Sequence, residues 1–354
     1  MAVKAQNKNL QSAKTNKKDE FYTQLSDIEK ELKHYKNHFK DKVVLCNCDD
    51  PRVSNFFHFF SYNFERFGLK KLIATCYKSQ DADLFSENKS ERAIYLEYDG
   101  DKNGDNIPNP EEIGIKHLQG DGDFRSKECI ELLKQADIIV TNPPFSLFRE
   151  YVAQLVEYDK KFVIIGNLNA LTYRDIFKLV KENKLWFGHS IHSGDREFRV
   201  PEDYTLSASS SRIDEIGNKF IRVKGVRWYT NLDFNERHED LILYKNYNED
   251  EYPKYENFNA INVNVTKDIP VDYSGAMGVP ITFIDKFNPD QFEIIGLGIS
   301  NSGLEVGVQP YKPEHKKYRK EIQKRGAVDG DLYMMKNGIV EVPYARILIR
   351  NKKI

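Results

Sequence analysis

Hydrophobic positions near the N-terminus alternate between helical spacing and short continuous runs. Steps of three and four residues predict one helix face made of Leu25, Ile28, Leu32, Tyr35 and Phe39. Residues 42–48 then form an apolar run, typical of a buried strand, that stops at the polar turn Asp49-Asp50-Pro51. Helical spacing returns at Val53, Phe56, Phe57, Phe60, Phe64 and Phe67, and Gly68 is expected to end this helix. A strand, a turn and a helix are therefore predicted in succession.

The same alternation continues along the next part of the chain. Apolar runs predict strands at residues 70–77, 92–100, 136–142 and 161–167, and helical stretches are predicted around 128–133 and 147–156. Strands that are apolar on both faces and alternate with helices favour an α/β fold with a doubly wound, Rossmann-like sheet. Ligands bind such sheets at the carboxyl ends of the strands. We therefore expect turns 47–51 and 142–145 to lie at one ligand-binding edge.

The pattern changes beyond Trp186. Residues 219–232 and 240–245 are expected to form antiparallel strands, and from about Asn246 onward Pro, Gly, Asn and Tyr dominate. The first 18 residues carry five lysines and no acidic residue, which predicts a flexible basic arm. The expected organisation is therefore an arm over 1–18, an α/β domain over 19–245 and a loop-rich region over 246–354.

Composition narrows the class of protein. The 354 residues include 53 Lys and Arg against 54 Asp and Glu, so nucleic-acid binding must depend on local patches rather than on bulk charge. The four cysteines form no CxxC pair, and no metal site is expected. We find neither a signal pattern nor an apolar run of about 18 residues, so we expect a cytoplasmic protein with reduced thiols and no membrane segment.

The tetrapeptide Asn142-Pro143-Pro144-Phe145 follows an apolar strand and precedes a helix. Two prolines fix the backbone, remove two N–H donors and leave carbonyl groups that can accept hydrogen bonds. The Asn142 side-chain oxygen and the Pro143 carbonyl could together accept both hydrogens of an exocyclic amine, and Phe145 could stack on its ring. The alternative is that the prolines only end a strand and that Phe145 is a core residue. The position at the ligand-binding edge favours a catalytic site.

Asn-Pro-Pro-Phe after a strand resembles the signature of amino-methyltransferases that use S-adenosylmethionine. Longer segments are similar to the EcoRI DNA adenine methyltransferase family, namely DEFYTQ (19–24), VLCNCDDPRVSNFF (44–57), GLKKLIATCY (68–77), GDGDFRS (120–126), TNPPFSLF (141–148), INVNVTKDIP (261–270) and GVPITFIDKFNP (278–289). The resemblance implies an enzyme that flips an adenine out of double-stranded DNA and methylates its N6 atom. S-adenosyl-L-methionine is the implied cofactor, GAATTC is the first site to test, and residues 246–354 are the implied target-recognition region. We expect a monomer, and a restriction endonuclease acting on the same site without a stable complex is a candidate partner.

The resemblance also assigns roles to cofactor-binding residues. Phe21, Tyr22 and Thr23 resemble the segment beside the methionine part of the cofactor. The turn formed by Asn47, Asp49, Asp50 and Pro51 takes the place of the first cofactor loop, although it lacks the usual glycines. Asp123 and Phe124 resemble the pair that holds the adenine of the cofactor. Each acid could instead cap a turn or helix, and which acid would bind the ribose stays open.

Candidate DNA-binding residues lie in two polar stretches. Arg237 and His238 are candidate base contacts, and the basic segment 311–325 offers Lys316, Lys317, Arg319 and Lys320 as phosphate contacts. A solvated helix face is the alternative for the basic segment. Two other functions remain open, a methyltransferase acting on a protein glutamine or on RNA, and a DNA-binding module without catalysis.

Overall fold

The computed structural model describes residues 21–49, 51, 54–76, 93–104, 108–109, 112–202, 204–206 and 210–354. The expected basic arm over 1–18 therefore lies outside the described residues. The chain divides into two compact units, each described separately below. One contains the described residues up to Ala170 together with Phe187–Asp233, and the other contains Leu171–Trp186 and Phe234–Ile354.

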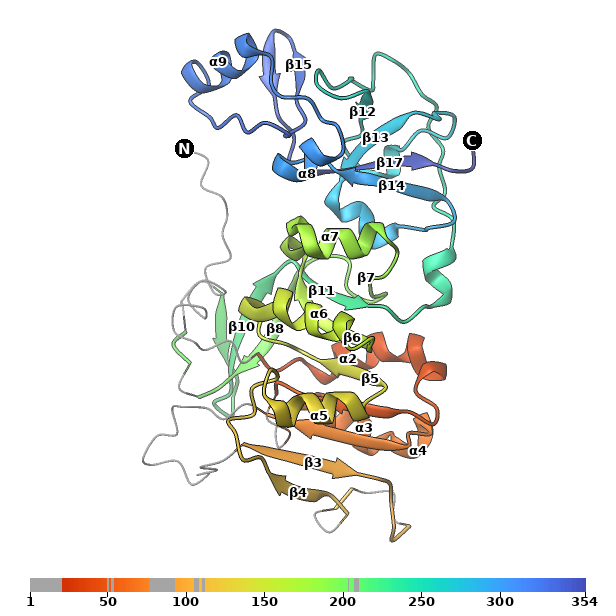
Figure 1. Cartoon of the computed structure of the whole chain (residues 1–354), viewed down its shortest axis with the longest axis vertical. Coiled ribbons are helices and arrows are strands. Elements are labelled where there is room, and N and C mark those ends of the chain that lie inside the picture. The colour runs from red at the N-terminus through yellow and green to blue at the C-terminus, as the bar shows by residue number, and fades with distance from the viewer. Residues whose placement is uncertain are drawn as a thin grey trace. The chain divides into compact units, whose positions relative to one another are not determined.

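The first unit is built on an eight-stranded sheet with the order β4-β3-β2-β1-β5-β6-β11-β7 (Figure 1). Its strands are β1 (Val43–Cys46), β2 (Lys71–Thr75), β3 (Ile94–Tyr98), β4 (Gly114–His117), β5 (Ile138–Thr141), β6 (Lys161–Asn167), β7 (Trp186–Phe187) and β11 (Val226–Thr230). The central strands β2, β1, β5 and β6 are parallel, whereas β3, β4 and β11 pair antiparallel. This confirms the expected α/β class with a parallel centre to the sheet.

Helices α3 (Asn55–Tyr62), α4 (Phe64–Phe67), α5 (Lys127–Gln135) and α6 (Phe148–Glu157) lie between successive parallel strands of this sheet, and α2 (Leu25–Leu32) precedes β1. Helix α7 (Arg174–Lys181) follows β6 and belongs to the second unit. Helix α5 packs against β1 and α6 against β6 (Figure 1). The helix predicted from Val53 is interrupted at Asn63, whose side chain donates to the Phe59 carbonyl at 2.8 Å. Gly68 ends it in the left-handed region at φ 62°, as expected.

A second, three-stranded sheet of this unit has the order β8-β10-β9, with β8 at Asp195–Val200, β9 at Ser211–Ile213 and β10 at Lys219–Lys224. Residues 219–232 were expected to be strands, and they form β10 and β11. Gly225, at φ +70°, separates these two strands, which belong to different sheets. The left-handed backbone favours glycine at this position.

The second unit contains a four-stranded sheet, β12 (Ala260–Asn262), β13 (Ala276–Pro280), β17 (Arg346–Asn351) and β14 (Phe292–Leu297). Its shorter elements are η4 (Asn235–His238), η5 (Thr266–Asp268), η6 (Ile281–Lys286), α8 (Ser300–Glu305), α9 (Pro313–Glu321), β15 (Met334–Lys336) and β16 (Ile339–Glu341). The predicted strand at 240–245 is wrong, because this segment makes only an isolated bridge between Lys245 and Pro270. Gln291 pairs instead with the backbone of Leu241 through both ends of its side-chain amide.

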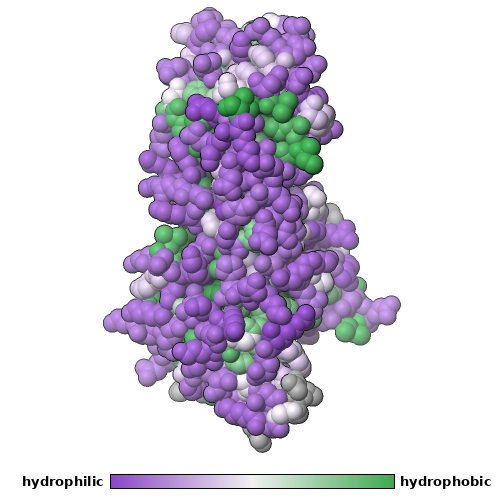
Figure 2. All heavy atoms as spheres, turned by 90° about the vertical axis from the view of Figure 1, so that its right-hand side faces the viewer, coloured by the Kyte–Doolittle hydropathy of each residue, from purple (hydrophilic) through white to green (hydrophobic). Residues whose placement is uncertain are grey.

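The hydrophilic character of the surface fits a chain in which 30% of the residues are charged. Figure 2 shows a face that is mostly hydrophilic, with separate hydrophobic groups. None of the described helices combines the length and the apolar character needed to cross a membrane.

Candidate active site

The corner Asn142-Pro143-Pro144-Phe145 follows β5 and leads through η2 (Phe145–Leu147) into α6. Asn142 is 6% exposed, and its Nδ2 atom donates a hydrogen bond to the Phe21 carbonyl. A carbonyl oxygen can only accept, so this bond fixes which end of the amide faces Phe21. The Asn142 Oδ1 atom, at the other end, is buried and has no hydrogen-bond partner among the described residues.

An unsatisfied buried oxygen requires an explanation, because leaving it without a donor costs about 1–3 kcal/mol. The Pro144 carbonyl, in contrast, accepts from the Leu147 N–H at 2.9 Å. The proline backbone thus holds a buried acceptor at the carboxyl end of a parallel strand, where ligands bind such sheets. This arrangement suits a ligand with an N–H donor, such as an exocyclic amine.

Aromatic rings surround the corner. The ring of Phe145 is half-buried and meets Phe21 at a centroid distance of 5.7 Å and Phe198 at 6.4 Å, both edge to face. Tyr204 meets Phe21 at 6.3 Å. Sequence reasoning missed Phe198 and Tyr204. Only the alternation along β8, which buries Phe198 and Val200, could have indicated an inward-facing ring.

The segment Phe21–Thr23, which accepts the Asn142 bond, is also held by β8 and α3. Tyr22 forms an antiparallel bridge with Arg199, with N–H to carbonyl distances of 2.9 and 3.2 Å. Asn55 donates to the Thr23 carbonyl at 2.7 Å. The Thr23 Oγ1 atom is buried and, among the described residues, has no hydrogen-bond partner. The segment therefore adds a second unsatisfied polar atom to this part of the molecule.

The turn after β1 lies beside the corner because β1 and β5 are neighbours. Asn47 is buried there, and its carbonyl accepts from Thr141 while its side-chain oxygen accepts from Tyr151. These bonds give Asn47 a supporting role within the protein. Asp49 is 6% exposed, and its carboxylate lies 3.4 Å from the Ser54 hydroxyl. Pro51 is buried, and Asp50 lies outside the described residues.

Two thiols in the same region stay protonated. Burial, followed by the negative charge of Asp49, raises the pKa of Cys46 and Cys48 well above the usual range. Burial likewise raises the pKa of Tyr151, which keeps its hydroxyl as a donor to Asn47. Neither cysteine is therefore a ready nucleophile, since the thiolate is the reactive form.

The loop that carries Asp123 and Phe124 approaches the end of β2. Gly122 has φ +80°, and a Cβ atom there would lie 2.1 Å from the Cys76 carbonyl oxygen, so only glycine fits. Phe124 is buried, with its ring centroid 5.1 Å from that of Tyr151. The structure thus brings Phe124 close to the ring that supports Asn47.

Asp123 has a strong partner within the protein. Arg125 donates to its carboxylate through Nε at 2.9 Å and through Nη2 at 2.6 Å, and these bonds lower the pKa of Asp123. Arg125 also donates to Glu150 of α6 at 2.9 Å. No sequence motif singles out Arg125, whose bonds favour the ionised, hydrogen-bond-accepting form of Asp123.

The predicted DNA-binding residues of η4 have different environments. Arg237 is buried, with its guanidinium carbon 3.8 Å from the Trp186 ring centroid and a hydrogen bond to Asn183. This favours a structural role for Arg237 over a base contact. His238 is exposed, and its Nδ1 atom lies 2.7 Å from Asp290, whose pKa it lowers.

Helix α9 carries the predicted phosphate contacts. Lys316 pairs with Asp329 at 2.5 Å, and Arg319 donates to the Gly326 carbonyl at 2.8 Å. Lys317 and Lys320 are exposed. Lys317 and Lys320 are therefore the better candidates for contacts with an anionic partner.

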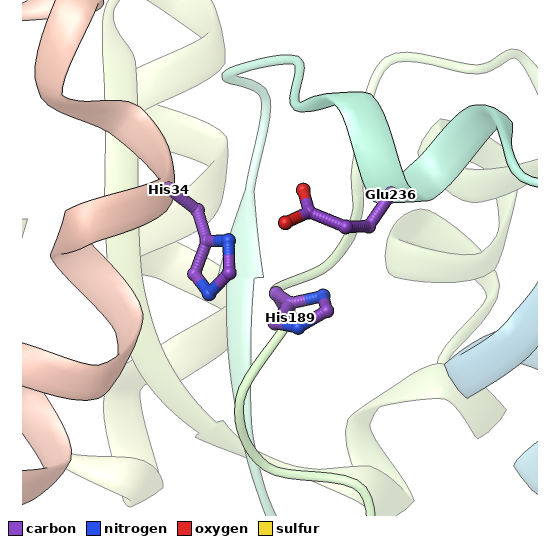
Figure 3. A group of neighbouring side chains, drawn as sticks. All are labelled: His34, His189 and Glu236. Atoms are coloured by element: carbon purple, nitrogen blue, oxygen red, sulfur yellow. The ribbon is translucent and has the colours of Figure 1, made fainter.

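A histidine pair was not anticipated from the sequence. His34 of η1 (Lys33–His38) faces His189, which follows β7, with a ring-centroid distance of 4.0 Å (Figure 3). Glu236, also drawn in Figure 3, belongs to the second unit. Burial, followed by the nearby His189 and Arg227, lowers the pKa of His192. The two paired histidines lie far apart in the sequence, so no motif could reveal them.

Comparison with known proteins covers almost the whole chain. The family model described as adenine-specific methyltransferase EcoRI matches residues 9–352. The Type II methyltransferase M.EcoRI of Escherichia coli is 50% identical over 356 residues, which cover 100% of this chain and 99% of that relative. M.MpnI of Mycoplasma pneumoniae is 42% identical over 287 residues (80% of this chain, 83% of the relative), and M.MgeORF184P of Mycoplasma genitalium is 40% identical over 288 residues (80% and 84%). No solved structure matches the chain. The similarity to M.EcoRI thus extends over both compact units.

Proposed function

Because the chain belongs to the EcoRI family of adenine-specific methyltransferases, we propose that it methylates N6 of adenine in double-stranded DNA as the modification enzyme of a Type II system. The observation that carries this proposal is the buried Asn142 Oδ1 atom, which has no partner among the described residues and belongs to the same corner as the half-buried Phe145. An adenine amine supplies the missing donor, and the purine ring supplies a flat surface for Phe145.

The chain acts mainly by positioning. Adenine must leave the base stack to reach the corner, at a cost of a few kcal/mol. Stacking on an aromatic side chain recovers about 1–3 kcal/mol per base. Asn142 Oδ1 and the Pro143 carbonyl then accept the two amine hydrogens, which directs the nitrogen lone pair and stabilises the positive charge that develops there. Because these acceptors are fixed by the Phe21 contact and by the prolines, they need no rearrangement during the reaction.

The residues beside the corner fit a cofactor of the S-adenosylmethionine type. When bound, this group supplies a methyl group attached to a positively charged sulfur. Thr23 offers a buried hydroxyl that no described residue engages, and Asp49 offers a buried carboxylate at the end of β1. Asp123 and Phe124 offer an ionised acceptor and an aromatic ring at the end of β2. We propose that these residues hold the amino acid, ribose and adenine parts of the cofactor, with Asp49 or Asp50 as the first acid.

The second unit contributes target recognition in this proposal. Residues 246–354 would read the site, with Lys317 and Lys320 as contacts to DNA, and His238, just before this region, would be a further contact. GAATTC, methylated at its inner adenine, is the proposed site. A restriction endonuclease acting on the same site would be the partner, and the enzyme itself would work as a monomer.

The test is methyl transfer by the purified full-length chain to a duplex containing GAATTC, followed by mass spectrometry of the nucleosides. We expect N6-methyladenine in this duplex and none in a duplex whose inner adenines are replaced. An RNA of the same sequence and a glutamine-containing peptide serve as competing substrates. Methyl transfer to the RNA or the peptide alone would contradict the proposal, as would a chain that binds the duplex without any transfer.

A further inference from the structure

The turn between β9 and β10 presents an isolated hydrophobic side chain. Ile216 is 85% exposed, the highest value among the large hydrophobic side chains that the structure describes. Ile213, at the end of β9, is 58% exposed. Scattered exposed hydrophobic residues are common, so exposure alone assigns no role to Ile216.

The turn is held rigidly. The Asp214 carboxylate accepts from the Ile216 N–H at 3.2 Å, from the Asn218 N–H at 2.8 Å and from the Asn218 side chain at 2.9 Å. The Asp214 and Gly217 N–H groups add backbone bonds across the turn at 3.0 and 3.1 Å. Ile216 is therefore displayed on a fixed support, which lowers the conformational entropy that a binding partner would have to remove.

The turn is also connected to the catalytic corner within the same unit. Lys219, the first residue of β10, donates to the Tyr204 carbonyl at 3.2 Å, and the Tyr204 ring packs on Phe21. Strand β10 lies beside β8 (Figure 1). In this pairing Ile221 is opposite Phe198. At about 3.3 Å per residue, Lys219 is only about 7 Å along the strand from Ile221. The turn therefore begins close to the rings that surround Phe145.

The charges of the hairpin favour DNA as the partner of its strands. Arg212 and Arg222 are exposed and share the single carboxylate of Glu197, at 2.5 and 3.8 Å. At the turn itself, Asp214 is occupied by its hydrogen bonds, whereas Glu215 is an exposed acid. Attraction to DNA phosphates must therefore come from the arginines of β9 and β10. The contribution of Ile216 to DNA binding must be an apolar contact.

We propose that Ile216 is a wedge that enters the base stack of the DNA duplex and fills the space left by the flipped adenine. This inference rests on the proposed function. Apolar side chains inserted between base steps are a known means of stabilising unstacked DNA. Ile216 is a positioning residue in this role, since it acts on the duplex while Asn142 and Phe145 hold the flipped base.

The experiment compares Ile216→Ala with wild type on two duplexes that carry 2-aminopurine at the target position. In one the target is paired, and in the other it lies opposite an abasic position, where flipping costs least. We expect affinity for the paired duplex to fall by about tenfold, because most of the apolar contact is lost, and the fluorescence increase on binding to fall with it. On the abasic duplex the defect should shrink to about twofold or less. Ile216→Leu should restore wild-type behaviour.

A matched control is Ile115→Ala, since Ile115 is 61% exposed on the edge strand β4 of the same unit. This variant should behave as wild type on both duplexes. An Ile216→Ala enzyme that equals wild type, or that is impaired equally on both duplexes, would overturn the wedge. So would a change in sedimentation, because it would assign Ile216 to a contact between copies of the chain. If wild type itself shows neither flipping nor methyl transfer, the proposed function fails instead.

Discussion

Replacing Asn142 by alanine separates the structural and catalytic roles of its side chain. The substitution removes the hydrogen bond to the Phe21 carbonyl, which contributes about 0.5–1.5 kcal/mol to stability. It also removes Oδ1, the acceptor proposed for the adenine amine. Loss of one fixed acceptor for developing charge typically lowers kcat by about 10²–10³, or about 2.7–4 kcal/mol. A native protein has about 5–15 kcal/mol of stability, so the variant should remain folded and lose turnover.

The assay is single-turnover methyl transfer to a GAATTC duplex, with calorimetric titration of S-adenosylmethionine in parallel. We expect cofactor affinity within about twofold of wild type, because Asn142 faces the proposed amine. Asn142→Asp retains an oxygen acceptor but loses the donor to Phe21, so its rate should lie between those of wild type and Asn142→Ala.

Asn231→Ala is a matched control. The Asn231 side chain accepts from the Phe162 N–H and donates to the Lys160 carbonyl, both at 2.9 Å, so both ends of its amide have partners within the protein. This variant should lower the thermal midpoint and leave the single-turnover rate of the folded enzyme unchanged. An Asn142→Ala enzyme with a rate within about tenfold of wild type would refute the assignment of this oxygen.

Three further outcomes follow from the described contacts. Phe145→Ala should weaken binding of a duplex with an abasic position opposite the target by about 1–3 kcal/mol in fluorescence anisotropy, and unchanged binding would exclude stacking. Lys317→Gln and Lys320→Gln should each reduce the slope of log affinity against log salt by about 0.9, whereas equal slopes would remove these lysines from the DNA interface. Arg125→Gln should lower the free energy of unfolding at pH 7. Because Arg125 lowers the pKa of Asp123, its stabilising effect is fully present above the unfolded pKa of about 3.9 and is lost as pH falls through the lowered folded pKa, so in urea unfolding the difference between wild type and variant should shrink as the pH is lowered below about 3.9. A constant difference across that range would contradict this pairing.

Elements of the fold could be predicted where the local pattern of apolar residues matches the burial of the element in the structure. Strand β6 at Lys161–Asn167 coincides with the predicted run 161–167, because continuous apolar residues suit a strand buried on both faces. The segment 240–245 also resembles a strand in sequence, with side chains that alternate in exposure. It forms no ladder because Gln291, about 50 residues away, takes the backbone bonds of Leu241. Such a distant side-chain partner leaves no local signal.

In the candidate site, too, some features follow from the local sequence and others depend on distant contacts. The position of Asn142 at a strand end could be predicted from its prolines and from the preceding apolar run. The hydrogen bond from Asn142 to Phe21 and the ring contact between Phe145 and Phe198 depend instead on how distant segments of the chain meet. Arg237 shows what the sequence leaves open, since this arginine of a polar loop is buried against Trp186. Only the tertiary structure distinguishes a buried cation from an exposed one.

Gly225 is the single residue between β10 and β11, and these strands belong to different sheets. Strand β11 continues into the central sheet that carries Asn142, whereas β10 pairs with the strand that carries Phe198. Gly225 therefore lets the chain pass directly from one wall of the corner to the other, while the bridge between Tyr22 and Arg199 holds the β8 wall to the N-terminal segment. Substitutions along the β9–β10 hairpin can therefore change how the enzyme contacts its substrate, provided that Gly225 is retained and the reacting groups keep their alignment.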